Sequence, residues 1–327
     1  MTSHVRVRLP FSLPLMTVSA ESLNTDRSSR TLSRTGAAAL RAMRPAHWAK
    51  NGLVLVPTLT AHAWRDPRVF VHAFLVTVAF SLIASAIYLV NDVLDAPHDR
   101  QHAVKRDRPI ASGALAPSLA IGLAFVLVLM AGLAIRDVAS PVRIVLLAYG
   151  VLMLAYSLLL KRVLALDVVA LAIGYTLRLA AGAAGIDVKL SPWLAAFSLF
   201  VFASLALLKR AAELRALVQR EYPAALPAPG RAYASADLPI VSMLGASSAM
   251  VAVMVLALYV TSPEVRVLYR APEVLWLLCP TVLFWLVRLW VLALRGVVRE
   301  DPVLFALRDL PSLAVLAACV GVVLLAL

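Results

Sequence analysis

Long runs of hydrophobic residues follow one another along most of this chain, separated by short polar segments. A helix needs about 20 mainly apolar residues to cross a bilayer, and most of the runs have this length. We therefore expect an all-α polytopic membrane protein with about nine transmembrane helices. The predicted helices are 52–64, 70–91, 115–134, 142–160, 165–186, 193–213, 239–260, 272–294 and 310–327, the first and last being short for a span.

Two polar segments interrupt this pattern. Residues 1–40 are rich in Ser, Thr and Arg and show no helical period, so they predict a disordered, basic N-terminal tail ahead of a transmembrane domain of residues 41–327. The segment Tyr222–Asp237 is rich in proline and is the longest polar connection between predicted helices. It is either a lid over a functional site or a passive linker.

Composition and charge agree with a membrane protein. The chain has 327 residues, of which 62% are hydrophobic, and a mean hydropathy of +0.87; a soluble domain is roughly half apolar. The formal charge of +13 would suit a nucleic-acid partner in a soluble protein. Here it is better explained by the enrichment of Lys and Arg in cytoplasmic loops, so we expect no nucleic-acid partner.

The distribution of cations also predicts the topology. If the N-terminus is cytoplasmic, the inner loops hold fourteen Lys and Arg and the outer loops hold seven. We expect a multi-pass protein of the inner (plasma) membrane whose acidic segment after the second helix faces the cytoplasm. Cys279 and Cys319 fall inside predicted helices without the spacing of a disulfide or metal site.

That acidic segment, Asn91–Asp99, ends the second predicted helix. Acidic residues at membrane depth are costly and usually functional. Asn91, Asp95 and Asp99 are spaced four apart, which places them on one helical face. Oxygen ligands on one face suit Mg²⁺ holding a diphosphate, so we assign these three as metal ligands and Asp92, Asp95 and Asp99 as catalytic. Pro97 predicts a kink or a restart of the helix between Asp95 and Asp99.

Cations follow the acidic segment and recur in other inner loops. Arg106 and Arg108 come within ten residues of the carboxylates, as a metal-bound polyanion would require, although the general excess of inner cations explains them too. Lys50, Tyr156 and Lys161 lie at inner helix ends. They are either substrate-binding residues or interfacial anchors.

Three further residues extend the candidate binding set. Arg178 lies in the middle of the fifth predicted helix, where an arginine needs a carboxylate, a phosphate or a wet cavity. At the inner end of the sixth, Lys209 and Arg210 precede Glu213, with Lys209 and Glu213 spaced as an i, i+4 pair. We assign Lys209 and Arg210 to an anionic substrate group, with Glu213 orienting Lys209; a simple surface pair is the alternative.

At these residues the chain resembles the UbiA superfamily of intramembrane prenyltransferases. The resemblance covers roughly residues 40–327 and rests on Asn-Asp-x-x-Asp-x-x-x-Asp at 91–99, followed by Lys105–Pro109 and Gly113. It implies nine helices around a central cavity, a cap over the cytoplasmic mouth, and Mg²⁺ at Asp-rich motifs. Aromatic prenyltransferases of the superfamily carry a second Asp-rich motif after the sixth helix, whereas here Lys209–Arg215 holds one acid and three cations.

Within the superfamily the chain is most similar to the decaprenyl-phosphate phosphoribosyltransferase branch. Four segments carry this resemblance: 44–51, 175–184, 204–214 and 301–309. It implies Mg²⁺-dependent transfer of 5-phosphoribose from a soluble donor, phosphoribosyl pyrophosphate, to a polyprenyl (decaprenyl) phosphate in the membrane. The alternatives are prenyl transfer to an aromatic acceptor such as 4-hydroxybenzoate, a different polyprenyl glycosyl-type transfer, or transport. Transport is disfavoured because nearly all ionisable groups gather on one side.

Overall fold

The computed structural model describes residues 34–327 except 62, 102–104, 229 and 299–300. Residues 34–43 form a helix with Ala38 and Ala42 buried, so the described part of the predicted tail is ordered against the domain. Small apolar side chains at i and i+4 give this helix a face that can pack. The rest of the predicted tail, 1–33, lies outside the described residues.

Within the described residues, the fold is helical apart from one β-bridge between Pro227 and Ala234. In the part of the chain that the structure describes, seven helices are long and apolar enough to cross a membrane, and the 17-residue α12 is an eighth candidate. The successive η1 and α2 segments occupy the place of the first predicted span, so the prediction of about nine membrane helices is confirmed. The main elements are η1 (Pro45–Leu55), α2 (Val56–Thr60), α3 (Pro67–Asp99), α4 (Pro117–Ala134), α5 (Ser140–Leu158), α6 (Leu166–Gly185), α7 (Pro192–Val218), α8 (Leu238–Val260), α10 (Leu278–Leu294) and α12 (Leu310–Ala326).

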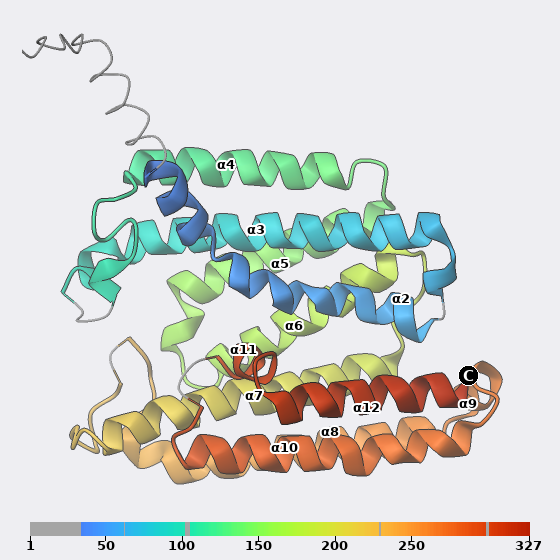
Figure 1. The fold of residues 1–327 in the computed structure, drawn as a ribbon. Helices are drawn as coiled ribbons and strands as arrows, with labels where there is room; N and C mark the ends of the chain where they lie inside the picture. The colour runs from blue at the N-terminus through green and yellow to red at the C-terminus, as the bar shows by residue number, and fades with distance from the viewer. Residues whose placement is uncertain (1–33, 62, 102–104, 229, 299–300) are drawn as a thin grey trace, which may run out of the picture.

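Short helical turns connect the long helices. They are η2 (Ala63–Arg65), η3 (Lys105–Asp107), η4 (Leu160–Arg162), η5 (Ser235–Asp237), α9 (Pro263–Leu268), η6 (Pro272–Leu277) and α11 (Pro302–Ala306). The loops after α3, α5 and α7 lie at one end of the bundle, at the left in Figure 1, while the C-terminus lies at the other end. This arrangement brings the polar inner loops of the sequence together.

The helix α3 carries the acidic segment at its end. It begins at Pro67, whose fixed φ suits the first helical position, and the Asp66 side chain caps it by accepting from the Arg68 amide. The helix continues through Pro97 to Asp99, so of the predicted kink or restart at Pro97, the restart is wrong. Proline removes one backbone donor, but so close to the helix end the cost is small. The 91–95–99 face is therefore kept.

The long helices form two connected groups around a central space. The η1 and α2 segments pack on α3 and α6, and α3 also contacts α4 and α5; on the other side α7 packs on α6, α8 and α10. Gly182 in α6 allows a close approach to η1, since a Cβ there would lie 2.0 Å from the Val54 carbonyl oxygen. Glycine at this crossing lets the first segment lie directly against α6.

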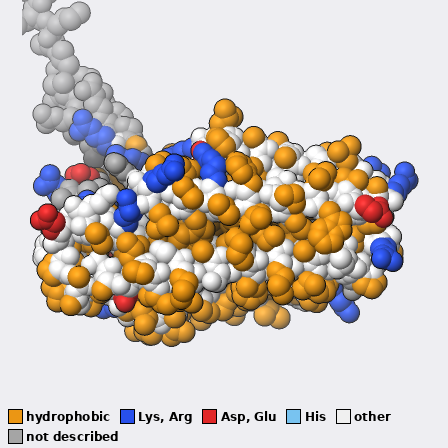
Figure 2. Space-filling view, turned by 90° about the horizontal axis from the view of Figure 1, so that it is seen from below, with side chains coloured by type: hydrophobic (Ala, Val, Ile, Leu, Met, Phe, Trp, Pro, Cys, Tyr) orange, Lys and Arg blue, Asp and Glu red, His pale blue; other side chains and the backbone are white. Residues whose placement is uncertain are grey.

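The outer surface suits a lipid environment. Figure 2 shows a face dominated by hydrophobic side chains, with charged side chains lying mainly towards its ends and one edge. Many large apolar side chains are exposed on the outer helices, including Leu133, Ile144 and Leu147. Such continuous apolar exposure is not tolerated by soluble monomers, and we conclude that the protein is an integral membrane protein.

Candidate active site

A cavity of about 620 Å³ lies among α3, α5, α6 and α7 and is closed in part by the loop between α7 and α8 and by α11. This is within the usual range for small-molecule sites. Its wall includes nine of the predicted site residues: Lys50, Asn91, Asp95, Asp99, Arg108, Tyr156, Lys161, Arg178 and Lys209. The structure thus gathers residues from five separate polar segments into one space.

The end of α3 supplies the oxygen-rich wall of this cavity. Asn91, Asp95 and Asp99 all line it, as their spacing predicts. The Asn91 amide donates to Asp95 Oδ2 at 3.1 Å, and Arg108 NH1 donates to Asp99 Oδ2 at 2.7 Å. Three oxygen-bearing side chains on adjacent turns of one helix therefore face one space.

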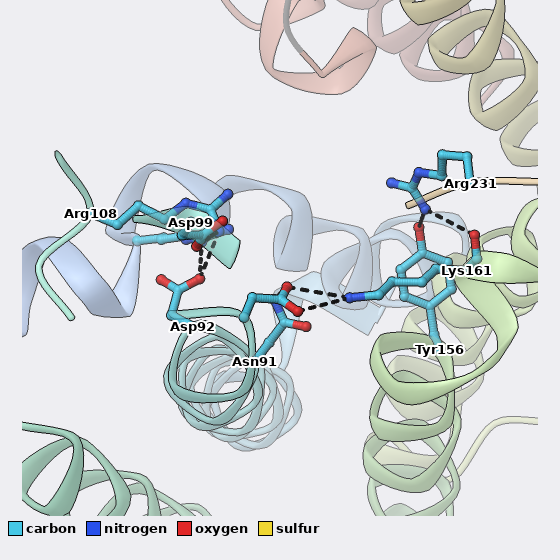
Figure 3. Close-up of polar contacts among 9 residues, drawn as sticks. Asn91, Asp92, Asp99, Arg108, Tyr156, Lys161 and Arg231 are labelled. Atoms are coloured by element: carbon cyan, nitrogen blue, oxygen red, sulfur yellow. Dashed lines mark hydrogen bonds and ion pairs between the residues drawn. The ribbon is translucent and has the colours of Figure 1, made fainter. Parts of the chain in front are cut away.

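Cations from the α5–α6 connection and the α7–α8 loop lie across from this wall. Lys161 Nζ is 3.3 Å from both carboxylate oxygens of Asp95. Arg231 NH1 donates to Tyr156 Oη at 3.2 Å and to the Lys161 carbonyl oxygen at 3.5 Å. Figure 3 shows Lys161 reaching toward the helix that carries Asn91, with Arg231 beside Tyr156 and away from Asp92 and Asp99. The α7–α8 loop thus contributes a side chain to the cavity and is not a passive linker.

A second charged group occupies another part of the wall. Lys50 Nζ lies 2.6 Å from Asp301 Oδ2, and Lys209 Nζ lies 3.7 Å from the same oxygen. The other oxygen of Asp301 caps α11 by accepting from the Val303 amide. Burial disfavours ionisation of Asp301, but Lys50 and Lys209 more than offset this and lower its pKa below the usual value. Two ammonium groups therefore share one carboxylate.

Arg178 lies in the membrane-spanning part of α6 and also lines the cavity. Its Nε donates to Asn51 Oδ1 at 2.9 Å, NH1 to the Gly174 carbonyl at 2.6 Å and NH2 to Tyr149 Oη at 2.9 Å. The guanidinium also stacks near Tyr149 and Tyr175, 4.7 and 5.1 Å from the ring centroids. All three nitrogens have neutral partners, so two of the five N–H groups remain for an anion in the cavity.

Four predicted site residues lie off the cavity wall. Asp92 is buried and pairs with Arg44 at 2.6 Å and with Arg108 at 3.2 Å, because it faces about 100° away from Asn91 on the helix. Arg106 is exposed and outside the wall. Arg210 is fully buried between Asp167 and Glu213, so Glu213 pairs with Arg210 and not with Lys209. The structure therefore does not bring Arg210 and Glu213 into the cavity with the other predicted binding residues.

Several cavity residues escaped the sequence analysis as site residues. Arg44, Asp301 and Arg231 line the cavity and each pairs with a predicted site residue or its helix. Tyr88 and Tyr175 also line it. The sequence carried a signal for Asp301, because an acid in an inner loop is expected to pair with a lysine of another inner loop. Arg231 carried none, since a single arginine in a proline-rich loop is unremarkable.

The oxygen-rich wall has the donor chemistry for a hard divalent cation. Among the described residues, no three His, Cys, Asp or Glu side chains converge closely enough to hold a metal by themselves. Asp95 and Asp99 with the Asn91 carbonyl oxygen offer oxygen donors on one face, and Mg²⁺ commonly takes one or two carboxylates and completes its shell with water and substrate phosphate. These residues fit a Mg²⁺ ion that arrives with a diphosphate or whose coordination shell a diphosphate completes.

Comparison with known proteins identifies the family. The model of the UbiA prenyltransferase family matches residues 54–310, most of the chain. This chain belongs to the UbiA prenyltransferase family. The resemblance inferred from its motifs is therefore confirmed, and members of this family are prenyltransferases.

Three relatives indicate where in the family it lies. It is 36% identical over 278 residues to the uncharacterized protein y4nM of Sinorhizobium fredii, and the aligned region covers 84% of this chain and 52% of y4nM. It is 32% identical over 288 residues to the nodulation protein NoeC of Azorhizobium caulinodans, covering 87% and 92%. It is 35% identical over 179 residues to the decaprenyl-phosphate phosphoribosyltransferase of Corynebacterium glutamicum, covering 54% of each. This UbiA chain thus spans about half the length of y4nM and of the phosphoribosyltransferase.

Solved structures confirm the fold. A UbiA homolog from Archaeoglobus fulgidus, bound to GPP and Mg²⁺, superposes with a TM-score of 0.66 at 13% identity and covers 87% of this chain and 99% of that one. At this identity the likeness establishes the shared arrangement of helices around a cavity, and no more.

Proposed function

We propose that this UbiA-family protein transfers 5-phosphoribose from phosphoribosyl pyrophosphate to a polyprenyl phosphate, releasing pyrophosphate. The observation that carries the proposal is the presence of two separate cationic groups in one cavity. The first group is Arg108, Lys161 and Arg231, which lie around the Asp-rich wall, the cavity face formed by Asn91, Asp95 and Asp99. The second is the Lys50–Asp301–Lys209 group. Two anionic substrate groups, a diphosphate and an acceptor phosphate, match this pattern.

The Asp-rich wall is the proposed place of the diphosphate. Asn91, Asp95 and Asp99 would hold Mg²⁺, which when bound neutralises diphosphate oxygens and favours departure of pyrophosphate. Lys161 and Arg231 face this wall and stabilise the charge that grows on the leaving group. The archaeal homolog bound to GPP and Mg²⁺ supports the same use of the conserved fold.

The second group is the proposed seat of the acceptor. The bond from the ribose anomeric carbon to pyrophosphate breaks, and an oxygen of the polyprenyl phosphate forms the new bond, through a transition state with oxocarbenium character. The acceptor oxygen is already an anion, so no strong general base is needed. Lys50 and Lys209 hold that anion, and Arg178 offers its two free N–H groups to phosphate oxygens deeper in the cavity.

The relatives support this donor and acceptor. The Corynebacterium glutamicum protein is named a decaprenyl-phosphate phosphoribosyltransferase, and the similarity covers half of each chain. The prenyl tail of the acceptor would lie among the apolar helices of the membrane. The inner membrane, with the site on the cytoplasmic side, suits a soluble phosphorylated donor and the excess of cations on that side.

Prenyl transfer to an aromatic acceptor is the second candidate. Besides Tyr156, three tyrosines line the cavity and suit an aromatic ring: Tyr88, Tyr149 and Tyr175. Against it stands Lys209, a cation in the segment where aromatic prenyltransferases carry a second acidic motif.

One pair of assays separates the two reactions. The purified protein in detergent is incubated with Mg²⁺, labelled phosphoribosyl pyrophosphate and polyprenyl phosphate, and separately with polyprenyl diphosphate and 4-hydroxybenzoate. We expect a labelled lipid only in the first mixture. Product only in the second mixture would overturn the phosphoribosyl proposal but would leave the proposed metal-binding role of the Asp-rich wall unaffected.

A further inference from the structure

A buried polar group outside the cavity wall has no part in the proposed reaction. It consists of Asp167 at the start of α6, Arg210 in α7 and Tyr233 in the α7–α8 loop, which are 0%, 1% and 6% exposed. Asp167 Oδ2 and Arg210 Nε form an ion pair at 3.2 Å. A buried ion pair is seldom justified by stability alone, because desolvation of both charges offsets their attraction.

Tyr233 joins the loop to this pair. Its hydroxyl donates to Asp167 Oδ1 at 3.0 Å and accepts from the Ala165 amide at 3.1 Å. Burial, together with the negative charge of Asp167, raises the pKa of Tyr233 to about 12, so the phenol keeps its proton at neutral pH and remains a donor. The loop is thereby fixed to the connection between α5 and α6, and through Asp167 to α7.

Arg231 is two residues from this attachment. The Ala228 amide donates to the Tyr233 carbonyl at 2.7 Å, and the Arg231 amide donates to the Ala228 carbonyl at 2.9 Å. Gly230, with φ of 73°, provides the left-handed position that this turn needs. The Arg231 guanidinium then reaches Tyr156 and the Lys161 carbonyl, beside the ammonium group that pairs with Asp95.

We infer that Tyr233 is a positioning residue, anchored by Asp167 and Arg210, which holds Arg231 against the Asp-rich wall so that Arg231 binds the diphosphate. The inference deepens the proposed function, on which it depends only for the nature of the bound group. Without the Tyr233 hydroxyl the turn loses its attachment to α6, and Arg231 must be ordered at the expense of binding free energy.

The inference is tested with inorganic pyrophosphate, which either candidate reaction releases. Binding to the full-length protein in detergent with MgCl₂ is measured by titration calorimetry for the wild type, Tyr233→Phe, Arg231→Ala and the double variant. We expect Tyr233→Phe to weaken pyrophosphate binding about tenfold and Arg231→Ala at least as much, with the double variant no weaker than Arg231→Ala. Losses that multiply in the double variant would show that Tyr233 does not act through Arg231.

The matched control is Tyr222→Phe. Tyr222 lies in the same loop, and its hydroxyl donates to the Pro227 carbonyl oxygen within that loop, 3.4 Å away. Removing this hydroxyl is expected to change pyrophosphate binding less than twofold. An equal loss in Tyr222→Phe and Tyr233→Phe would overturn the assignment of a specific anchor.

Hydrogen exchange supplies a readout that does not depend on any ligand. Amides of residues 230–236 should exchange about tenfold faster in Tyr233→Phe than in the wild type, and at wild-type rates in Tyr222→Phe. Unchanged exchange in Tyr233→Phe would refute the anchor. If that variant does not fold, Tyr233→Leu, which also lacks the hydroxyl, replaces it in the same cycle with Arg231→Ala and carries the same expectation.

The outcomes separate this inference from the proposed function. A wild-type protein that binds pyrophosphate with the expected coupling but ignores phosphoribosyl pyrophosphate would overturn the phosphoribosyl proposal and leave the anchor standing. A wild-type protein that does not bind pyrophosphate with Mg²⁺ would overturn the role of Arg231.

Discussion

Single carboxylates on α3 differ in role because helical phase decides what each one meets. Asp95 lies on the cavity wall with Asn91 and Asp99, while the neighbouring Asp92 turns away toward Arg44 and Arg108. A one-residue step on a helix rotates the side chain by about 100°. The Asp-rich segment therefore divides into a cavity face, proposed to bind metal, and a structural face.

Replacing Asp95 by Ala removes a proposed metal ligand and the partner of Lys161. Loss of a direct ligand should lower turnover about 100-fold or more, since several kcal/mol of transition-state stabilisation are lost. Turnover is measured across a range of MgCl₂ concentrations, with Asp137→Ala as control because Asp137 is exposed and pairs with its neighbour Arg136. Near-normal turnover of Asp95→Ala in the presence of chelator would contradict the metal assignment.

Lys209 shares Asp301 with Lys50 at the proposed acceptor seat. The change Lys209→Ala removes one of two ammonium groups there and leaves the Asp-rich wall intact. We expect KM for polyprenyl phosphate to rise about tenfold, with KM for the soluble donor changed less than about threefold. Steady-state kinetics with each substrate varied in turn measures both. A larger rise in KM for the soluble donor than for polyprenyl phosphate would show that the acceptor phosphate binds elsewhere.

Arg178 combines a structural and a proposed binding role. Its three nitrogens have three separate partners on Asn51, Gly174 and Tyr149, an arrangement that a lysine cannot reproduce. Arg178→Lys should lower turnover about tenfold or more while the protein still inserts in the membrane. Arg136→Lys, on the exposed outer side, is the control. Equal turnover of Arg178→Lys and the wild type would exclude a role for the planar guanidinium.

Between elements, α6 and the first segment approach closely at Gly182. A Cβ at Gly182 would lie 2.0 Å from the Val54 carbonyl oxygen and 2.9 Å from the Val54 carbonyl carbon, both of them backbone atoms. Gly182→Ala should therefore push η1 away from α6 and lower stability by about 1–3 kcal/mol. The loss should appear as a lower Tm in detergent, together with lower activity because Lys50 and Asn51 lie on η1.

The control for this substitution is Gly132→Ala in α4, where a Cβ would meet nothing within 4 Å. Alanine is the better helix former there, so Tm should stay the same or rise slightly. A Tm for Gly182→Ala as high as that of Gly132→Ala would mean that the two segments separate at no cost.

Over the whole molecule, the distribution of cations predicts which side faces the cytoplasm. Cysteine is introduced at Arg136, in an outer loop, or at Arg106, beside the Asp-rich end, after both native cysteines are replaced. A membrane-impermeant maleimide applied to intact cells should label the Arg136→Cys protein, and the Arg106→Cys protein only after permeabilisation. The reverse pattern would invert the topology and place the site outside.

The sequence predicted the helices well because a membrane span must be continuous and apolar for about 20 residues, a signal that needs no tertiary information. The 91–95–99 face was equally predictable, since it depends on one helix alone. Lys209 and Arg210 show where this ends. They are adjacent, and only the packing of α7 decides that Lys209 faces the cavity while Arg210 is buried against Asp167.

Contacts between distant segments could not be predicted from the sequence for the same reason, because they depend on how the helices pack. Asp301 meets Lys50 across 251 positions of the chain. Lys209 also lies beside Asp301, and Glu213 pairs with Arg210 instead of the expected Lys209. Arg231 reaches Tyr156 only because Tyr233 fixes the loop. No local period or spacing encodes these meetings, which arise when the helices assemble around the cavity.

The pairing of Lys161 with Asp95 and of Arg108 with Asp99 has a thermodynamic consequence. In this arrangement the acids of the cavity wall are already balanced by side chains of the protein. A divalent ion arriving alone competes with those cations, whereas one arriving with a diphosphate offers them new anions to bind. Binding of metal and of diphosphate should therefore be mutually reinforcing, each raising the apparent affinity for the other by the same factor, as reciprocal linkage demands.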